Sequence, residues 1–267
     1  LPPKKVAMMG VGAAFSFLGM MFNIPLPGGT TGHAVGGTLI ALLLGPYASC
    51  ISVSVALLLQ ALIFGDGGIL SFGANCFNMA FVLPFVGYAV AHVISPHFGT
   101  NKKRDLVASG AGSYIGINAA AFCAAVEFGI QPMLFRDSAG NALYCPYGLN
   151  VSIPAMMAGH LTIFGLAEVV FTVAILAFVM TAAPGFFSEK KEEAGVSHSL
   201  KVLLGALIVA TPLGLIADGT AWGEWGTDEI AATGAGYTPR GMADGFSLQS
   251  LLPDYSLKGL PDWTAYI

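Results

Sequence analysis

Long apolar runs alternate along the chain with short segments rich in glycine, proline and charged residues. An α-helix needs about 20 predominantly apolar residues to cross the hydrocarbon layer of a bilayer. By this criterion the sequence predicts an all-α integral membrane protein, a bundle of about seven transmembrane segments. The predicted segments are residues 6–23, 33–44, 46–64, 75–94, 106–128, 153–183 and 200–217.

The second segment is unusually short. Gly45 and Pro46 divide the apolar run between residues 33 and 64, because proline cannot continue the hydrogen-bond ladder of one helix and suits the first turn of the next. Residues 33–44 would cover only about 18 Å as a helix. We therefore predict that this helix, which follows His33, is packed inside the protein.

Basic residues set the predicted orientation. Lys4 and Lys5 precede the first run, Lys102, Lys103 and Arg104 follow the fourth, and residues 189–193 follow the sixth. Lysine and arginine accumulate in cytoplasmic loops. The loops around His33, at 65–74 and at 136–151, and the tryptophan-containing segment 218–267, are then predicted to be extracytoplasmic.

The composition supports a multi-pass protein of the cell membrane. Only 10% of the residues are charged and 55% are hydrophobic, with a mean hydropathy of +0.73. A net charge of −4 without a basic stripe argues against nucleic-acid binding. The cysteines are interpreted as packing residues because they form no Cys-x-x-Cys pair. They are Cys50, Cys76, Cys123 and Cys145.

Small side chains recur every four residues in the run 106–128, and such a stripe lies on one face of a helix and lets another backbone approach closely. The stripe consists of Ala108, Gly112, Gly116, Ala120 and Ala124. Its partner is either another helix of this chain or a separate subunit. The second alternative makes these residues candidates for docking a partner.

Candidate chemistry concentrates at His33, which stands among five glycines in residues 28–37. Glycine lets backbone crowd close to a ligand, so the pattern favours a small-ion site. The competing interpretation is a histidine that bonds a loop carbonyl at a helix start. Other polar residues of these loops are candidates for orienting the imidazole through its second nitrogen, and Asp66 is a candidate outer carboxylate. The orienting candidates are Thr30, Thr31, Asn75 and Asn78.

His160 and Glu168 lie within the predicted sixth span. Ionisable groups inside a membrane segment are functional candidates by default. A structural role is the alternative, with Asn118 or Glu127 of the preceding helix as partners.

Short motifs in a fixed order resemble the substrate-binding membrane subunit of energy-coupling-factor nickel and cobalt transporters, the NikM/CbiM family. The similarity runs from about Pro25 to Glu168, and Leu213 to Gly226 is similar to the N-type component often fused behind that subunit. We expect two domains: residues 1–190, a substrate-binding domain lacking its N-terminal helix, and residues 191–267, a partial N-type component with one span and an extracytoplasmic segment. The motifs are Asn-Ile-Pro at 23–25, Gly-Gly-Thr-Thr-Gly-His at 28–33, Leu-Gly-Pro at 44–46, Gln-Ala-Leu at 60–62, Gly-Asp-Gly-Gly at 65–68, Gly-Ala-Asn at 73–75 and Asn-Met at 78–79.

The resemblance implies that the chain captures Ni²⁺ or Co²⁺ from outside and releases it inward, with a transmembrane coupling subunit and two ATPase subunits as partners. It also implies a nitrogen-rich metal site made by the free amino terminus and histidine of a leading Met-His dipeptide and by the histidine that aligns with His33. No Met-His opens this sequence. The remaining ligands are therefore expected in an absent N-terminal segment. Nickel and cobalt differ too little in ligand preference for His33 to decide between them.

Two other function classes fit the sequence less well. An intramembrane enzyme would need a nucleophile with its base or a His-Glu-x-x-His motif, and these spans contain neither. A gradient-driven secondary metal-ion permease would show repeated halves with broken helices, and no convincing repeat is present. The sequence also lacks the P-loop motif, so the chain is not expected to bind ATP.

Overall fold

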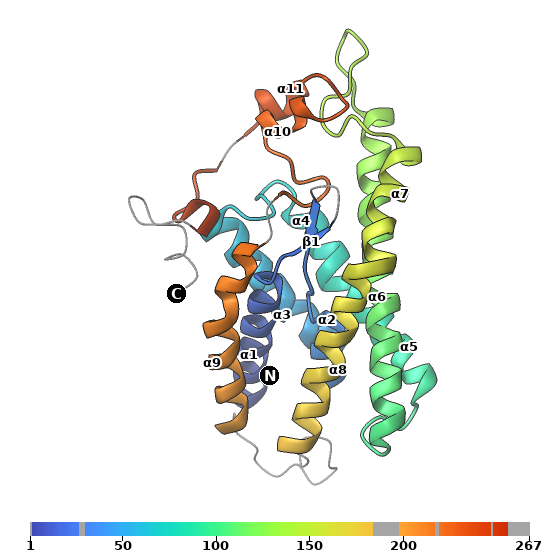
Figure 1. Cartoon of the computed structure of the whole chain (residues 1–267), viewed down its shortest axis with the longest axis vertical. Helices are drawn as coiled ribbons and strands as arrows, with labels where there is room; N and C mark the ends of the chain where they lie inside the picture. The colour runs from blue at the N-terminus through green and yellow to red at the C-terminus, as the bar shows by residue number, and fades with distance from the viewer. Residues whose placement is uncertain (1, 27–29, 184–197, 217–218, 247, 256–267) are drawn as a thin grey trace.

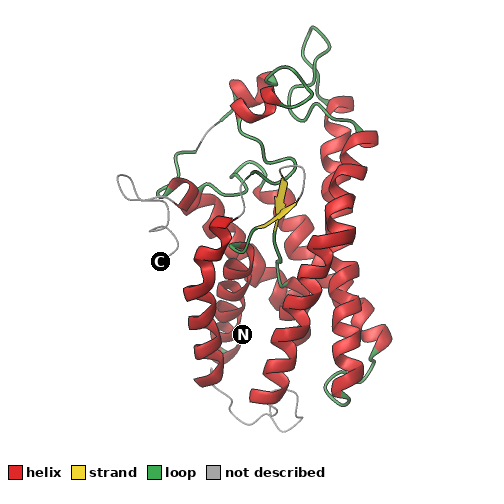
Figure 2. Ribbon diagram, viewed as in Figure 1, coloured by secondary structure: helices red, strands yellow, loops and turns green. Residues whose placement is uncertain are grey.

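Upright helices form most of the computed structural model, with loops and short helices gathered over one end (Figures 1 and 2). The structure describes residues 2–26, 30–183, 198–216, 219–246 and 248–255. The helices are α1 (Pro3–Met20), α2 (Gly37–Leu44), α3 (Pro46–Leu59), α4 (Phe72–Asn75), α5 (Leu83–Ile94), α6 (Lys102–Leu134), α7 (Leu149–Gly159), α8 (Gly165–Ala182), α9 (His198–Ala210), α10 (Thr227–Ala232) and α11 (Arg240–Ala243). Short 3₁₀ segments lie at Thr211–Ile216 and Pro253–Tyr255.

Three π-helical segments continue or join α-helices without a break. They are Gln60–Phe64 after α3, Cys76–Val82 between α4 and α5, and His160–Phe164 between α7 and α8. The joined helices give four segments in the described residues that are long and apolar enough to cross a membrane. These are Pro46–Phe64, Phe72–Ile94, Lys102–Leu134 and Leu149–Ala182.

The remaining three predicted spans are helical but fall short of that criterion. The first is α1, with 18 residues that include Lys4 and Lys5. The second is α2, with eight residues, and the last is α9, whose apolar part covers Lys201–Leu213. A count of about seven spans is therefore not confirmed, whereas the helical membrane architecture is.

The predicted break at Gly45 and Pro46 is present. Gly45 has a φ of +93°, which glycine adopts without the strain of a side chain, and Pro46 begins α3. The start of the preceding helix differs from the prediction, because α2 begins at Gly37 and leaves His33 in the loop before it. With eight residues α2 is about 12 Å long. Residues 37–42 are buried, as expected for a short helix packed inside the protein.

A two-stranded antiparallel hairpin interrupts the otherwise helical fold. Its strands β1 (Ile24–Leu26) and β2 (Thr30–Gly32) pair with Ile24 opposite Gly32. The hairpin was not part of the all-α prediction. It leads the chain from the end of α1 to His33, which follows β2 directly.

The longest helix, α6, exceeds its predicted bounds at both ends. Its 33 residues span about 50 Å, well beyond a hydrocarbon core of about 30 Å. Asn101 caps its start by accepting a hydrogen bond from the backbone N–H of Arg104 at 3.2 Å. The upper ends of α6 and α7 project above the other long helices, to the level of α10 and α11, and carry the loop that joins them (Figure 1).

The stripe of small residues on α6 packs against helices of the same chain. A Cβ atom on Gly116 would lie 2.7 Å from the backbone oxygen of Leu83 on α5, and one on Gly112 would lie 3.1 Å from the Cβ of Ala91. Ala108 and Ala120 are buried, with exposures of 0% and 3%. The stripe is therefore a seam inside this chain, and we do not propose it as a docking face for a separate subunit.

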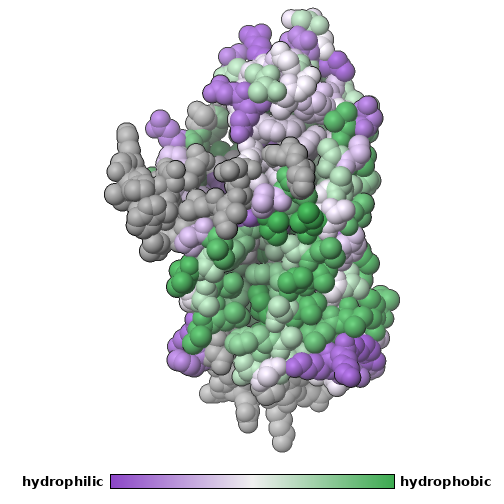
Figure 3. Space-filling view, in the orientation of Figure 1, coloured by the Kyte–Doolittle hydropathy of each residue, from purple (hydrophilic) through white to green (hydrophobic). Residues whose placement is uncertain are grey.

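The C-terminal segment arches from the end of α9 over the end of the bundle that carries the hairpin (Figure 1). Hydrophobic residues cover the middle of the face shown in Figure 3, and hydrophilic residues gather at its two ends. The connection from α5 to the basic start of α6 lies at the end opposite the C-terminal segment.

The seam on α6 predicts that Gly116→Leu destabilises the protein. The larger side chain would collide with the α5 backbone, and overpacking of this kind costs about 1–3 kcal/mol. Gly10→Leu on α1 is a matched control, because no atom lies within 4 Å of a Cβ at that position. Melting curves in detergent should show a lower midpoint for the Gly116 variant only. Equal midpoints for both variants would contradict a close seam.

Candidate metal-binding site

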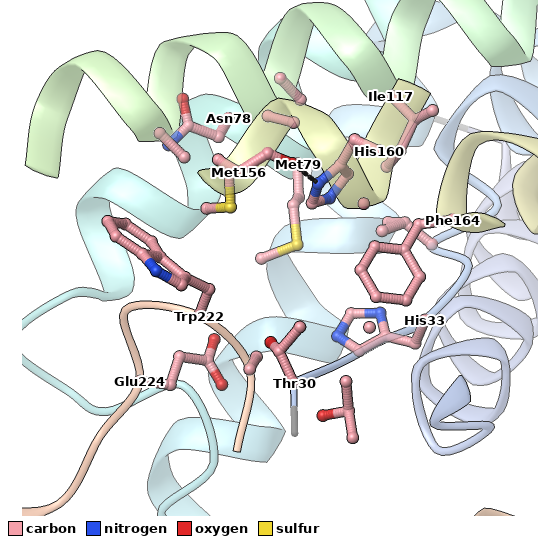
Figure 4. Close-up of a pocket in the computed structure, with 18 of the residues that line it drawn as sticks. Thr30, His33, Asn78, Met79, Ile117, Met156, His160, Phe164, Trp222 and Glu224 are labelled. Carbon is pink, nitrogen blue, oxygen red and sulfur yellow. Dashed lines mark hydrogen bonds between the residues drawn. The ribbon is translucent and has the colours of Figure 1, made fainter. Parts of the chain in front are cut away.

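The hairpin delivers His33 to a cavity at the centre of the molecule. Gly32 brings the strand against Phe164, since a Cβ at Gly32 would lie 2.7 Å from the phenyl ring. The next residue, His33, points its imidazole into a cavity of about 140 Å³ (Figure 4). His33 also lines a second cavity of about 20 Å³, together with Asp66 and Asn75.

Side chains from distant parts of the sequence surround the imidazole. The thioethers of Met79 and Met156, the indole of Trp222 and the carboxylate of Glu224 reach the cavity from different sides (Figure 4). Each π-helical segment contributes lining residues. They are Gln60 and Ala61 in the smaller cavity, Asn78 and Met79 in the larger one, and His160 and Phe164 also in the larger one.

Burial favours the neutral form of the His33 imidazole. Burial lowers its pKa below the ordinary value, because desolvation penalises the charged form. Its Nδ1 atom is buried and has no hydrogen-bond partner among the residues that the structure describes. A neutral imidazole carries a lone pair and is the form that binds metal ions.

The threonines predicted to orient His33 make hydrogen bonds elsewhere. The Thr30 hydroxyl donates to the backbone oxygen of Thr220 at 3.3 Å, and that of Thr31 donates to the backbone oxygen of Gly219 at 3.2 Å. Thr31 also forms a parallel bridge with Ala221. These residues attach the C-terminal segment to the hairpin instead of fixing the imidazole.

The asparagines also have other partners. Asn75 donates to the backbone oxygen of Gly67 at 3.1 Å, which ties the glycine loop together. Asn78 donates to the carboxylate of Glu127 at 2.7 Å, and its own side-chain oxygen is buried without a partner in the described structure. Both residues line the large cavity beside His33, but their hydrogen bonds do not orient it.

Asp66 lies in the small cavity and connects it to the C-terminal segment. Its carboxylate accepts a hydrogen bond from the Tyr255 hydroxyl at 2.6 Å and one from Gln60 at 3.3 Å. The Tyr255 ring stacks on Phe64 with centroids 4.3 Å apart, and the backbone N–H of Leu252 donates to the oxygen of Ile63 at 2.7 Å. Asp66 thus serves as an attachment point for residues 252–255.

Glu168 is bonded directly to the His33 loop, a role that the sequence did not indicate. Its fully buried carboxylate accepts from the backbone N–H of Val35 at 2.7 Å and from that of Gly36 at 3.1 Å. The partners expected from the sequence are wrong, because Asn118 donates to the backbone oxygen of Tyr114, and Glu127 accepts from Asn78. His160 has a backbone partner as well, with its Nδ1 atom 2.9 Å from the carbonyl oxygen of Met156.

Glu224 is a second residue that the sequence analysis missed. It belongs to the C-terminal segment, lines both cavities, and directs its carboxylate toward the larger one (Figure 4). Desolvation by the surrounding protein and repulsion from Asp66 raise the pKa of Glu224 to about 7. The only available signal was its position between Trp222 and Trp225, which places an acidic residue in an aromatic segment.

The arrangement offers one imidazole and nearby thioether and carboxylate groups to an ion. Within the described residues, no group of three or more histidine, cysteine, aspartate or glutamate side chains could hold a metal by itself. A volume of about 140 Å³ exceeds the roughly 30 Å³ that one water molecule occupies. The cavity therefore has room for an ion together with further donor atoms or water.

Two family models match the chain in succession. Residues 2–186 match the cobalt uptake substrate-specific transmembrane region, and residues 198–267 match the PDGLE domain. The boundary between the matches lies within the connection from α8 to α9. The expected division at residues 190 and 191 falls outside the described residues.

Similar proteins include the probable fused nickel transport protein LarMN of Lactiplantibacillus plantarum. It is 48% identical over 99% of this chain and 80% of its own length. The fused nickel transport protein NikMN of Rhodobacter capsulatus is 46% identical over 95% of this chain and 78% of its own length. The crystal structure of a truncated transition metal transporter superposes with a TM-score of 0.62 at 51% identity, covering 68% of this chain and 83% of the other.

The contacts of Tyr255 predict that Tyr255→Phe loosens the C-terminal segment. The variant keeps the ring that stacks on Phe64 and removes the hydroxyl that bonds Asp66, at a net cost of about 1 kcal/mol. Amide hydrogen exchange in residues 250–255 should become faster. Tyr147→Phe is the control, since its hydroxyl bonds Thr233 instead. Unchanged exchange in the Tyr255 variant would contradict an attachment through Asp66.

Proposed function

Because the chain belongs to the family of cobalt uptake substrate-specific transmembrane regions, we propose that it is the substrate-binding membrane component of an ATP-driven nickel or cobalt uptake transporter. In this role it captures Ni²⁺ or Co²⁺ from outside the cell membrane and releases the ion inward. The ion is the transported substrate and not a resident cofactor.

The observation that carries this proposal is the position of His33. A neutral imidazole points into a cavity formed where the hairpin, the π-helical segments and the C-terminal segment meet (Figure 4). Imidazole nitrogen is a suitable ligand for nickel and for related divalent ions. His33 supplies one ligand in this proposal, and the cavity leaves space for the others.

The geometry of the cavity supports a site for capture from outside. Its lining includes residues of the C-terminal segment, which covers the end of the bundle opposite the basic start of α6. Glu224 adds a carboxylate to this outward side, and a carboxylate attracts divalent cations. An ion that arrives from outside therefore meets Glu224 and His33 within one chamber.

Energy for uptake is proposed to come from partner chains. The sequence contains no P-loop, so ATP would be hydrolysed by two separate ATPase subunits and the work transmitted by a transmembrane coupling subunit. Uptake of radioactive nickel into cells tests whether partner chains supply the energy. Uptake should require all partners and stop when the ATPases are inactivated. Uptake by this chain alone, abolished by collapsing the ion gradients, would instead favour a secondary permease.

His33→Ala should abolish high-affinity binding of Ni²⁺ and Co²⁺ while leaving the protein folded. Loss of a direct ligand should weaken the affinity by at least about 100-fold, since loss of an outer hydrogen-bond partner alone costs about 10–100-fold. Isothermal titration calorimetry of the full-length protein measures the effect. His92→Ala is the control, because that imidazole stacks on Tyr88 in α5 outside the cavity. Wild-type affinity in the His33 variant would refute the site.

A further inference from the structure

A buried carboxylate holds the segment that carries His33. Glu168 has an exposure of 0%, and its oxygens accept from two consecutive backbone N–H groups, those of Val35 and Gly36. These groups lie at the start of α2, where N–H groups have no partner within the helix and attract negative charge. The carboxylate therefore satisfies two buried N–H groups directly before α2, two and three residues beyond His33.

Two further helices hold the same stretch of backbone. The hydroxyl of Ser16 on α1 donates to the backbone oxygen of Val35 at 2.9 Å, and that of Ser49 on α3 donates to the oxygen of Gly37 at 2.7 Å. Gly36 between them has a φ of +72°, and a Cβ there would lie 2.9 Å from the ring of Phe171. Residues 35–37 are thus fixed from three sides, and Glu168 provides the only carboxyl group among these anchors.

The Nδ1 atom of His33 lacks, within the described residues, the hydrogen bond that commonly orients a metal-binding histidine. Such an imidazole commonly donates its second ring N–H to a carboxylate or carbonyl, which fixes both tautomer and orientation. The Nδ1 atom of His33 is buried and without a hydrogen-bond partner in the described part of the chain. The direction of the ring then depends on the position of its backbone. That position depends in turn on the hydrogen bonds that fix residues 35–37.

We propose that Glu168 is a positioning residue for the metal site. It acts on the backbone next to His33 and keeps the imidazole pointing into the cavity. The described residues that line the cavity do not include Glu168, so it does not act as a ligand. This inference rests on the proposed function, because it assumes that His33 binds the transported ion.

Glu168→Gln tests the role with a small change of shape. The amide keeps one acceptor oxygen but turns an N–H₂ group toward backbone donors, so the loop loses part of its anchor. We expect the affinity of the full-length protein for Ni²⁺ to fall by about 10–100-fold, together with a shift of the ligand-field absorption bands of the bound ion. The spectral shift separates altered ligand geometry from a mere loss of folded protein.

Asp105→Asn is the matched control. Asp105 is also fully buried and accepts from two loop N–H groups, those of Gly99 at 2.9 Å and Asn101 at 3.3 Å, at the opposite end of the bundle. Its variant should lower the melting temperature without changing Ni²⁺ affinity or the absorption bands. If Glu168→Gln does not accumulate, Glu168→Asp retains the charge on a side chain one methylene shorter, and the same changes are expected.

The outcomes are distinguishable. Wild-type affinity and spectrum in a folded Glu168 variant, with wild-type protein binding Ni²⁺ normally, would overturn the positioning role and leave the proposed function intact. Failure of both variants to fold would assign Glu168 to the fold as a whole and also overturn it. Failure of wild-type protein to bind Ni²⁺ or Co²⁺ would overturn the proposed function and this inference together.

Discussion

The fold depends on satisfying the buried polar groups of the backbone near His33. The hydrogen bonds between Glu168 and the backbone of Val35 and Gly36 do this. A non-helical loop inside an apolar bundle exposes N–H and C=O groups that neither lipid nor apolar side chains can satisfy. Here a carboxylate from α8 and hydroxyls from α1 and α3 satisfy them. Because those anchors come from different helices, the loop can only take its position once the helices have assembled around it.

The π-helical segments show a second consequence of building a cavity inside a helical bundle. A π-helical turn inserts an extra residue into a helix, and such turns occur frequently at functional sites. Gln60–Phe64, Cys76–Val82 and His160–Phe164 each begin within a membrane-spanning helix, and each contributes residues to the cavities beside His33. The changes of helical pitch therefore coincide with the cavities beside His33.

Much of the helical framework could be predicted from the sequence, because apolar run length and the break at Gly45 and Pro46 are local signals. Three predicted runs that form shorter helices show the limit of this criterion: α1 carries charges, and α2 is buried by protein and not by lipid. Local pattern could not foresee the hairpin, since its three-residue strands are too short to show a period. It also could not foresee π-helical turns, which have the same apolar pattern as the α-helices around them.

Among the residues around the cavity, only His33 had a sequence context that indicated a site. His33 stood out among glycines, and the structure places it in the cavity. The hydrogen-bond partners of Thr30 and Thr31 could not be predicted, because they lie about 190 residues away in the sequence. Glu168 was a candidate from the sequence, but its bonds to Val35 and Gly36 were not predicted, and Glu224 was not recognised, for the same reason.

The contacts of the C-terminal segment explain why joining the two matched domains in one chain favours formation of the cavity. Its contacts with Thr30 and Thr31 lie on the hairpin that leads to His33, and its contacts with Asp66 and Gln60 lie at the end of a π-helical segment. Glu224, between these two attachments in sequence, reaches the cavity. Separate chains would have to meet before such a surface could form, whereas fusion keeps the segment at a high effective concentration over the site. Residues of both matched domains thus line the cavity.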